Sequence, residues 1–420
     1  MRARSPKHGM GTAGIIAEYN PFHAGHLYHI NKTRELGYEN IIVVLGSNVT
    51  QRGELPIFSK WARAEAALLC GVDLVLELPA VYTAASTERF AAAVHILDGL
   101  GVADILSFGS ECGNTNLLTH TALLCGGIEQ TKEFKEATAI GLSYPAARTQ
   151  AVYSLYQSGN VPQDRTVETA NLPDIIKILS SPNDTLGLEY IKTILRNNLS
   201  IIPVAIKRKG TGHHGGENGL FASAGHIRQN LSRLPDFTPG AAVEIFNREI
   251  ASGKCRNSNA PYERIALYCL KTAPRAIFEN IPDISEGLHN RMYSAAAKAG
   301  SLDEYISLVK TKRYTRTRIS RHILQLALRA HNKISPGGLT AAPPPYIRVL
   351  GHNKKGRALL SAARKKSSLP IFSSFSKLYR AFPEYAETER NASSLFSLCL
   401  PDMFRSQNGL NEYKQNVIVI

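Results

Sequence analysis

Two histidines three positions apart are the first residues whose types and spacing suggest chemistry. His23 and His26 form an HxGH pattern that follows an apolar, β-branched run at residues 14–17 and a break at Pro21. Residues 27–36 then suit a helix, so the pattern predicts a strand, a tight loop and a helix start. The free N–H groups of a first helical turn attract anions, which makes phosphate the expected ligand. Taken alone, the two histidines could equally be ordinary loop and cap residues.

The elements around this loop are short apolar runs that alternate with helical segments. Strands are expected at the ranges 40–45, 73–78, 105–109 and 201–206, with Ala-rich crossover helices at 57–70 and 83–97. Nearly continuous apolar runs are typical of parallel strands covered on both faces. The sequence therefore predicts a doubly wound α/β domain with a Rossmann-like parallel sheet, in which ligands bind beyond the carboxyl ends of the strands.

The rest of the chain is mainly helical. Helices are expected within 115–200, and Pro235 and Pro239 mark a boundary near residue 240. The predicted organisation is an N-terminal extension, an α/β domain, a helical domain, a Pro/Gly/Ala linker and a C-terminal segment, with the bounds 1–13, 14–240, 241–333, 334–345 and 346–420.

The positive charge is confined to the second part of the chain. Of 49 Lys and Arg and 34 Asp and Glu, residues 1–240 hold 21 of each kind, whereas residues 241–420 hold 28 basic and 13 acidic residues. A neutral part joined to a basic part suggests a small-molecule site on one and a polyanion on the other. A basic surface kept for solubility would give the same count.

The remaining composition indicates a cytoplasmic protein without a structural metal. The six cysteines show no CxxC pair or metal-ligand spacing, which favours buried, reduced thiols. No stretch approaches the roughly 20 apolar residues of a membrane span, and the charged start of the chain does not resemble a signal peptide. We therefore expect no metal ligands in the protein, and no membrane partner.

Several further residues stand at expected strand ends or helix starts. Arg52, Lys60 and Arg63 could hold a triphosphate or a carboxylate substrate, or could be charges on a solvated loop and helix face. Asn183 could cap the helix that follows it, as could Asp184.

Arg208 follows the strand at 201–206, and a planar, permanently charged guanidinium suits phosphate. Gly109, at the end of the 105–109 strand, would allow close approach of a nucleotide, although a Gly there is usually just a turn.

Two basic clusters lie in the C-terminal part. Residues 310–321 contain six basic residues and one Tyr without any acidic residue, and residues 346–357 are followed by Arg364, Lys365 and Lys366. Basic side chains with hydroxyls and an aromatic residue between them suit RNA phosphates and a stacked base. A charge run is otherwise usually a solvated helix face.

Together these motifs resemble a known family. EYNPFHAGHLYHI is similar to the ATP signature of the HxGH nucleotidyltransferase superfamily, in the form of the bacterial tRNA(Met) cytidine acetate ligases. Later elements of this family are resembled in the same order, to about residue 370, by QRGE with KWARAE, FGSE, SPN, KR, KTKRYTR, and RVLG with KKG. Val49, Gly225-His226 and His352 depart from the family pattern.

The resemblance implies a two-step ligase. Acetate attacks the α-phosphate of ATP to give acetyl-adenylate, and the acetyl group then passes to N4 of the wobble cytidine of elongator tRNA(Met). ATP is the substrate, and Mg²⁺ is expected to accompany it.

The resemblance also assigns residues. The catalytic residues are His23, His26 and Arg208. The expected ATP contacts are Gly14, Ile15, Ile16, Ala17, Glu18, Tyr19, Asn20, Pro21, Phe22, His23, Ala24, Gly25, His26, Leu27, Gly109, Asn183, Arg208, Ser223 and Arg228. The expected tRNA contacts are Lys310, Lys312, Arg313, Tyr314, Arg316, Arg318, Arg321, Lys354, Lys355 and Arg357.

Two other classes remain open from the sequence. A small-molecule adenylyltransferase would use the same HxGH loop and would not need residues after 240. A non-catalytic tRNA-binding protein with a degenerate nucleotide fold would also explain the charge asymmetry, and the Gly225-His226 departure is its best support.

Overall fold

The computed structural model describes residues 11–158, 171–209, 217–218, 221–281, 284, 287–329, 342–401 and 411–420. The first ten residues of the predicted N-terminal extension and most of the predicted linker at 334–345 lie outside these ranges. The four strands and the two crossover helices that the sequence predicts around the HxGH loop each have a counterpart among the described elements.

Five parallel strands form the centre of the molecule and confirm the predicted α/β fold. Their order across the sheet is β3-β2-β1-β4-β5, and all four neighbouring pairs are parallel. The strands are β1 (Thr12–Ala17), β2 (Asn40–Gly46), β3 (Leu74–Leu78), β4 (Ile105–Ser110) and β5 (Ile202–Lys207). The order reverses beside β1, which places the loop after β1 at the switch point where such sheets bind ligands.

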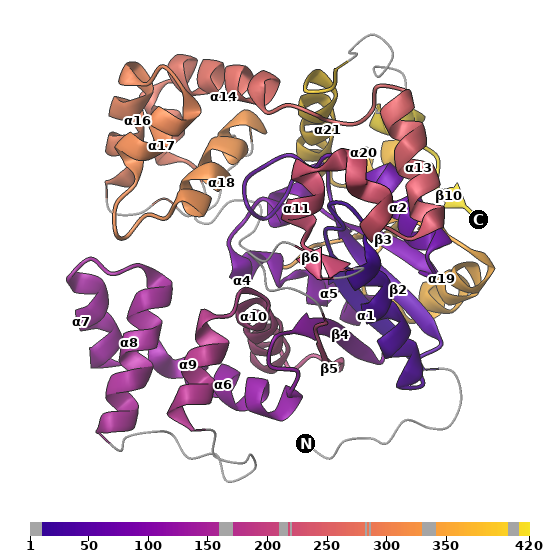
Figure 1. Ribbon diagram of the computed structural model, residues 1–420, viewed down its shortest axis with the longest axis horizontal. Coiled ribbons are helices and arrows are strands. Elements are labelled where there is room, and N and C mark those ends of the chain that lie inside the picture. Colours follow the sequence, from indigo (N-terminus) through magenta and orange to yellow (C-terminus); the bar gives the residue numbers. More distant parts are fainter. Residues whose placement is uncertain are drawn as a thin grey trace.

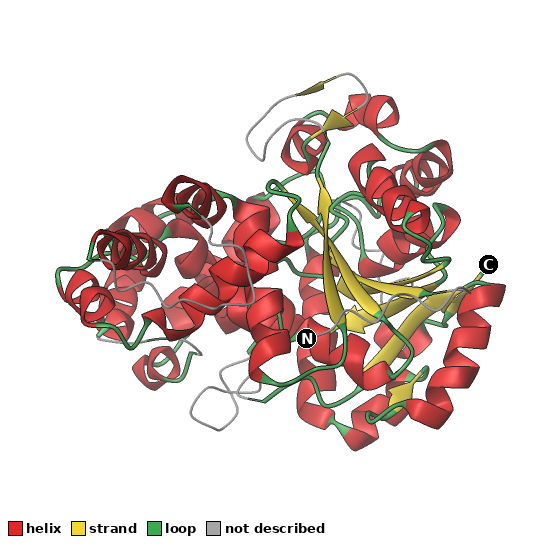
Figure 2. Ribbon diagram, turned by 90° about the horizontal axis from the view of Figure 1, so that it is seen from below, coloured by secondary structure: helices red, strands yellow, loops and turns green. Residues whose placement is uncertain are grey.

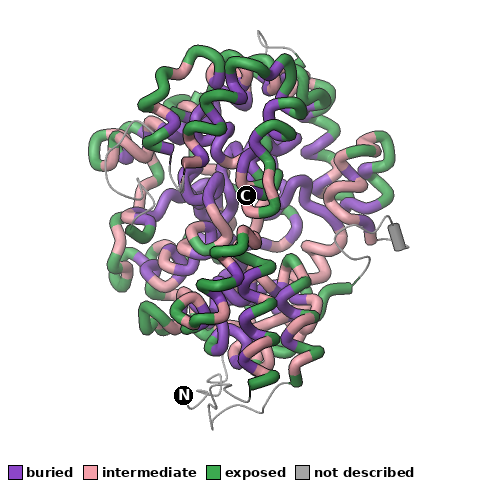
Figure 3. Tube along the Cα trace, turned by 90° about the vertical axis from the view of Figure 1, so that its left-hand side faces the viewer, coloured by how far each residue is buried: buried purple, intermediate pink, exposed green. Residues whose placement is uncertain are grey.

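Helices cover both faces of this sheet (Figure 2). One face is covered by α1 (Ala24–Glu35) and α2 (Lys60–Leu69), and the other by α5 (Ala93–Leu100) and α10 (Pro182–Arg196). The side chains of residues 41–45 in β2 are fully buried between these layers, which explains the unbroken apolar run in the sequence. The buried positions run through the centre of the molecule and the exposed ones lie on its outside (Figure 3).

The C-terminal segment extends the same sheet. Strand β8 (Ile347–His352) pairs antiparallel with β3, and β9 (Ile371–Phe372) and β10 (Ile418–Val419) each pair parallel with β8. The described strands of the predicted segment 346–420 are therefore part of the sheet that carries the HxGH loop. Helix α13 (Gly240–Ala251) also belongs to this body, because it packs on α2 with the rings of Phe58 and Phe246 stacked 4.3 Å apart.

The remaining longer described helices form two groups beside the sheet and a third set, from the C-terminal segment, that packs against the sheet and its neighbouring helices (Figure 1). The first group is α6 (Thr115–Ile128), α7 (Lys132–Ala139), α8 (Tyr144–Gln157) and α9 (Leu172–Ser180). The second is α14 (Ala260–Thr272), α15 (Arg275–Glu279), α16 (Leu288–Lys298), α17 (Leu302–Val309) and α18 (Arg316–Ala327). The C-terminal helices are α19 (Lys354–Lys366), α20 (Phe375–Ala381), α21 (Pro383–Leu398) and η4 (Glu412–Lys414).

Short elements complete the connections. Between β3 and α5 the single expected crossover helix is broken into α3 (Ala80–Thr83) and α4 (Thr87–Phe90) before α5. After β5 come β6 (Glu217–Asn218), β7 (Phe221–Ala222), α11 (Ala224–Gln229), η1 (Leu231–Arg233) and α12 (Leu234–Phe237).

A buried ion-pair network joins the C-terminal segment to the parallel strands. It consists of Lys60, Glu77, Arg348, Glu389 and Glu412, all of them buried. Lys60 Nζ contacts all three carboxylates, at 3.1 Å for Glu389 and 2.8 Å for Glu412, and Arg348 contacts Glu77 at 2.9 Å and Glu412 at 2.6 Å. Removing one member of such a network leaves unpaired buried charge, which is far more costly than losing a surface pair.

Candidate nucleotide-binding site

The HxGH loop has the predicted strand, turn and helix. β1 ends at Ala17, Tyr19 has a left-handed φ of 47°, and the Asn20-Pro21 peptide is cis. Helix α1 starts at Ala24 with His23 as its N-cap. The side chains of Tyr19 and Phe22 are buried, so contacts from these two residues to a nucleotide would use the backbone.

The hydrogen bonds of the two histidines fix where their protons lie. Nδ1 of His23 accepts from the backbone N–H of Gly25 at 3.0 Å, and Nδ1 of His26 accepts from the backbone N–H of His23 at 3.2 Å. A neutral imidazole whose Nδ1 accepts must carry its proton on Nε2. The rings stack with their centroids 3.8 Å apart. Each ring therefore has an Nε2–H donor that is not used by its cap contact.

A third histidine, not assigned from the sequence, continues the row. His29 lies one turn further along α1, and its Nε2 is 2.8 Å from Ser107 Oγ on β4. The i, i+3 spacing from His26 was a visible signal that His29 lies on the same helix face. We call His23, His26, His29 and Arg208 the histidine cluster.

The pKa values of the three histidines are lowered. Burial is the largest cause for each, followed by Arg208 for His23 and His29 and by His23 and then Arg208 for His26. The pKa falls to about 3 for His23 and about 4 for His29. Before an anion binds, the three rings are therefore neutral at pH 7, and they act as hydrogen-bond donors rather than as cations.

Arg208 supplies the positive charge of the cluster. It follows β5, and its backbone N–H donates to Ser110 O at 2.9 Å across the end of β4. Its side chain is exposed and runs over Gly109, where a Cβ would lie 3.4 Å from Arg208 Cγ. A side chain at position 109 would thus be in ordinary contact with the arginine, which places Arg208 directly beside Gly109. Among the described residues, no carboxylate is paired with Arg208.

Helix α11 faces the same loop. Ser223 is its N-cap and accepts from the backbone N–H of His226 at 3.1 Å, and Arg228 donates to the backbone carbonyl of Asn20 at 2.9 Å. A Cβ at Gly225 would lie 3.8 Å from Ser223 Oγ, which is ordinary contact. The departure at Gly225 therefore leaves space beside Ser223 without altering the helix start.

The expectation that Asn183 or Asp184 caps α10 is wrong. Ser181 is at the N-cap position without a side-chain cap bond, and Pro182 is the first helical residue. The reason is that Glu111, from the end of β4, accepts from Asp184 N at 3.1 Å and from Asn183 Nδ2 at 2.5 Å. The site does bring Asn183 to the edge that holds Gly109 and Arg208.

Lys60 and Arg63 do not face a ligand. Lys60 belongs to the buried network, and Arg63 donates to the backbone carbonyls of Glu18, Ser47 and Phe58. Arg63 therefore holds the loops after β1 and β2 together. The same loops are joined by Gln51 N, which donates to Glu18 Oε1 at 2.6 Å, and burial raises the pKa of Glu18.

The two basic clusters lie at opposite ends of the sheet. The N-terminal half of α18 packs against the loop after β2, where a Cβ at Gly53 would collide with the backbone of Ser320 and Arg321. By contrast, α19 starts beside Asp73, just before β3, with Asn353 Nδ2 donating to Asp73 Oδ1 at 2.8 Å. The structure thus brings α18, but not Lys354, Lys355 and Arg357, to the carboxyl edge of the strands.

Within the first cluster, Tyr314 is only 8 % exposed and Arg318 lies over its ring at 5.3 Å. Its face is covered, so the structure does not offer this ring to a base. Lys310, Lys312 and Arg316 are exposed, whereas Arg313, Arg318 and Arg321 are partly buried.

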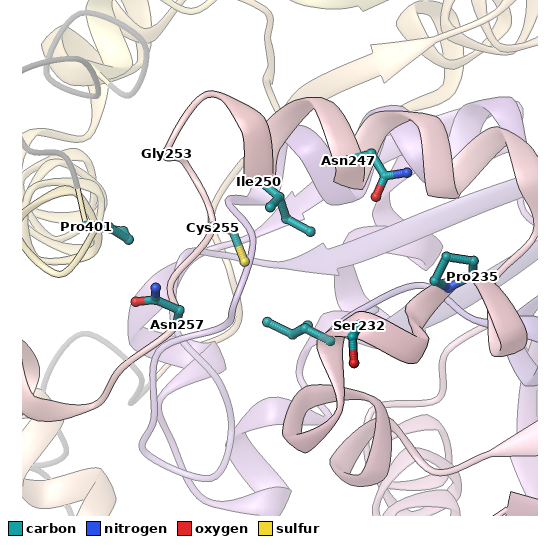
Figure 4. A pocket seen from close by; sticks show the side chains of 9 residues that line it. Ser232, Pro235, Asn247, Ile250, Gly253, Cys255, Asn257 and Pro401 are labelled. Carbon is teal, nitrogen blue, oxygen red and sulfur yellow. The ribbon is translucent and has the colours of Figure 1, made fainter.

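A separate cavity of about 440 Å³ lies between α13 and the η1–α12 segment (Figure 4). Its lining includes Ser232, Asn247, Ile250 and Cys255 and contains no Lys, Arg or His. It therefore lacks the cations and donors that a triphosphate needs, and the histidine cluster remains the candidate site.

The described ranges hold neither a metal-ligand group nor a membrane-spanning helix. No group of three His, Cys, Asp or Glu residues suited to a metal ion occurs there. No helix there is long and apolar enough to cross a membrane.

Comparisons with known proteins agree with this geometry. The family model described as HIGH Nucleotidyl Transferase matches residues 10–411. A tRNA(Met) cytidine acetate ligase of Acetivibrio thermocellus is 35% identical over 98% of this chain and all of its own length. One of Caldicellulosiruptor saccharolyticus is 37% identical over 98% of this chain and 99% of its own.

Solved structures show the same fold over nearly the whole chain. Crystal structures of Thermotoga maritima TmcAL, one apo and one bound with alpha-thio ATP, are each 32% identical and cover 98% of this chain and all of their own, with TM-scores of 0.86 and 0.85. The matches in sequence and in structure confirm the resemblance of the motifs, which ran to about residue 370, and extend it over nearly the whole chain. This chain belongs to the tRNA(Met) cytidine acetate ligase family of the HIGH nucleotidyl transferases.

Proposed function

We propose that this protein activates acetate with ATP and transfers the acetyl group to N4 of the wobble cytidine of elongator tRNA(Met), forming N4-acetylcytidine. The single observation that carries the proposal is the histidine cluster at the sheet's switch point, with two Nε2–H donors and a guanidinium that no described carboxylate pairs with. Family membership over the full length supports the same reaction.

In the first step, an acetate oxygen attacks the α-phosphorus of ATP and pyrophosphate leaves. Negative charge builds up on the phosphate oxygens in the transition state. Fixed donors at a partly dry site stabilise such charge more than water does. The Nε2–H groups of His23 and His26 and the guanidinium of Arg208 are these donors, with Ser223 and Arg228 placed at α11 for the remaining phosphates.

In the second step, the cytidine amine attacks the acetyl carbonyl carbon, AMP leaves, and the amine loses a proton. We assign no residue as the acceptor of that proton. Mg²⁺ is expected to arrive on the phosphate oxygens of ATP, since the described residues offer no carboxylate set of their own for it.

For the RNA, we propose the basic residues of the range 310–321, in the first half of α18 and just before it, as the primary contact. This range adjoins the loop after β2, and that loop also contacts Glu18. Arg321 donates to the carbonyl of Gln51 at 3.4 Å, so α18 and the HxGH loop are connected through one short segment. The contacts at Lys354, Lys355 and Arg357 stay a prediction for a more distant part of the tRNA.

The test measures acetate-dependent release of AMP and pyrophosphate from ATP, with and without elongator tRNA(Met), and acetylated cytidine by mass spectrometry. The wild type should give all three products, and His26→Ala should lose them. Lys132→Ala, an exposed change on α7, is the control. No acetate-dependent turnover with tRNA binding preserved would contradict the proposal and favour the non-catalytic RNA-binding alternative.

Truncation after residue 240 is not a usable test of the adenylyltransferase alternative. It would remove β8 from the sheet and would take Arg348, Glu389 and Glu412 from the buried network. Loss of activity would then report misfolding. Turnover with a phosphorylated small acceptor in place of acetate, measured on the full chain, separates the two functions.

A further inference from the structure

The end of β4 and the start of α10 each supply a carboxylate that accepts hydrogen bonds from the other segment. Glu111 accepts from Asn183 Nδ2 at 2.5 Å and from Asp184 N at 3.1 Å. In return, the carboxylate of Asp184 accepts from Ser110 Oγ and from the backbone N–H of Cys112 at 3.1 Å. The motif FGSE with the Cys112 that follows it is thus held to the motif SPND, about 70 positions away in the chain, by hydrogen bonds from four donor groups to these two carboxylates.

This exchange makes the start of α10 unsuitable for phosphate. A free helix N-terminus attracts anions, but Glu111 already occupies the first turn here and Asp184 is fully buried behind it. Burial raises the pKa of Asp184, and the neighbouring Glu111 charge adds to that shift. A second anion would meet one carboxylate directly and another close by.

The contact with Glu111 also orients the side-chain amide of Asn183. A carboxylate can only accept here, so the amide group that faces Glu111 must be the NH₂ group. The amide oxygen, Oδ1, is then left on the other side. No described residue donates a hydrogen bond to it, and Asn183 is partly exposed.

We propose that Glu111 is a positioning residue that fixes Asn183 so that its Oδ1 accepts a hydrogen bond from the nucleoside part of ATP. Asn183 Oδ1 is an acceptor beside two carboxylates, so it favours a ligand group that donates a hydrogen bond. The nucleoside has two kinds of donor, the ribose hydroxyls and the adenine amine. Phosphate offers none when ionised. The backbone N–H of Arg208 donates to Ser110 O, next to Glu111, so the guanidinium of Arg208 is placed to bind the phosphates of the same ATP. The inference rests on the proposed binding of ATP at this edge.

The experiment measures the Kd of ATP by calorimetry on the full chain. Asn183→Ala and Glu111→Ala should each weaken ATP about tenfold, which is what one hydrogen bond of about 1.4 kcal/mol amounts to. The double variant should bind no more weakly than Asn183→Ala, because Glu111 acts through Asn183. Glu111→Gln, which keeps one acceptor oxygen for the amide, should recover part of the affinity.

Ser110→Ala is the matched control, because it breaks the other half of the exchange and leaves Asn183 and Glu111 in contact. It should lower the melting temperature without changing the Kd. If Ser110→Ala weakens ATP as much as Glu111→Ala, or if the double variant is additive, Glu111 merely supports the fold and the inference fails.

Nucleotide analogues identify the donor. Inosine triphosphate lacks the adenine amine, and 2′-deoxy-ATP and 3′-deoxy-ATP each lack one hydroxyl. The analogue that lacks the donor bound by Oδ1 should lose affinity in the wild type and lose nothing further in Asn183→Ala. If no analogue's penalty depends on Asn183, the inference is overturned. If the wild type binds no ATP at all, it is the proposed function that fails.

Discussion

The histidine cluster and the buried ion-pair network are two polar regions of the same sheet, and they use charge in opposite ways. In the network, two cations meet three carboxylates and all five side chains are buried. In the cluster, three neutral imidazoles surround Arg208, and no described carboxylate pairs with it. The charged groups of the network pair with one another, whereas the cluster presents hydrogen-bond donors to a ligand.

The difference teaches how to interpret basic residues in a motif. Lys60 and Arg208 both follow strands of the parallel sheet, and from sequence both were candidates for phosphate. What separates them is the presence of acidic partners hundreds of positions away, Glu389 and Glu412, which no local pattern reveals. Four changes test this contrast.

The largest effect is expected in the network. Lys60→Met should lower the free energy of unfolding by about 3–5 kcal/mol, because it removes one of the two buried cations and leaves Glu389 without the ion pair that Lys60 supplies. Urea denaturation measures it. Lys32→Met, which removes an exposed pair with Glu35, is the control and should change little. Equal stability of the two variants would mean that the network does not hold the sheet together.

In the cluster, a large effect on rate without a comparable effect on stability is expected. His26→Asn keeps an oxygen that can accept from His23 N but removes the Nε2–H donor. Loss of one such donor to a transition state typically costs about 10²–10³ in rate, measured as acetate-dependent exchange of pyrophosphate into ATP. A fall in unfolding free energy as large as that of Lys60→Met, with the rate retained, would contradict the contrast.

The pH dependence of stability should come from the network. Burial, then Glu77, raises the pKa of Glu389 to about 8 from its ordinary 4.5. The folded protein therefore holds a proton that the unfolded chain releases above pH 4.5, so this contribution to stability is lost as pH rises through 8. Burial opposes the lowering of the Glu412 pKa, but Lys60 and Arg348 bring it to about 2, so Glu412 matters only in acid.

Unfolding measured from pH 6 to 9 checks this. The wild type should lose stability as pH rises from 6 to about 8 and lose little more above it, and Glu389→Gln, which cannot ionise, should lose less. An unchanged slope in Glu389→Gln would assign the pH dependence to other groups.

The smallest effect is expected at the two basic clusters. Lys312→Ala, before α18, should weaken tRNA binding a few-fold and reduce the slope of log Kd against log salt by about 1, as the loss of one phosphate contact does. Lys355→Ala, on α19 at the other end of the sheet, should have a smaller effect. Filter binding at several salt concentrations compares them, and a reversed order would move the RNA surface to α19.

The sequence predicted the parallel strands well, because fully buried strands have a strong local signal, as residues 41–45 show. It also located His23, His26, Arg208 and the start of α11. It could not predict that Glu111 would replace a cap residue at α10, because that contact joins residues 72 positions apart. Nor could it show that β8 inserts beside β3, since an apolar run does not specify its neighbour in a sheet.

The pairing of β8 with β3 has a consequence for how the protein is made. When residues 1–240 have left the ribosome, β3 still presents an open edge, and Lys60 and Glu77 still lack Arg348, Glu389 and Glu412. An open edge strand is a template for pairing with another chain. The half-made protein is therefore exposed to aggregation for as long as translation of residues 241–352 takes. The residues of the nucleotide site are synthesised first, but the sheet that carries them gains the strand beside β3 only after synthesis has passed β8.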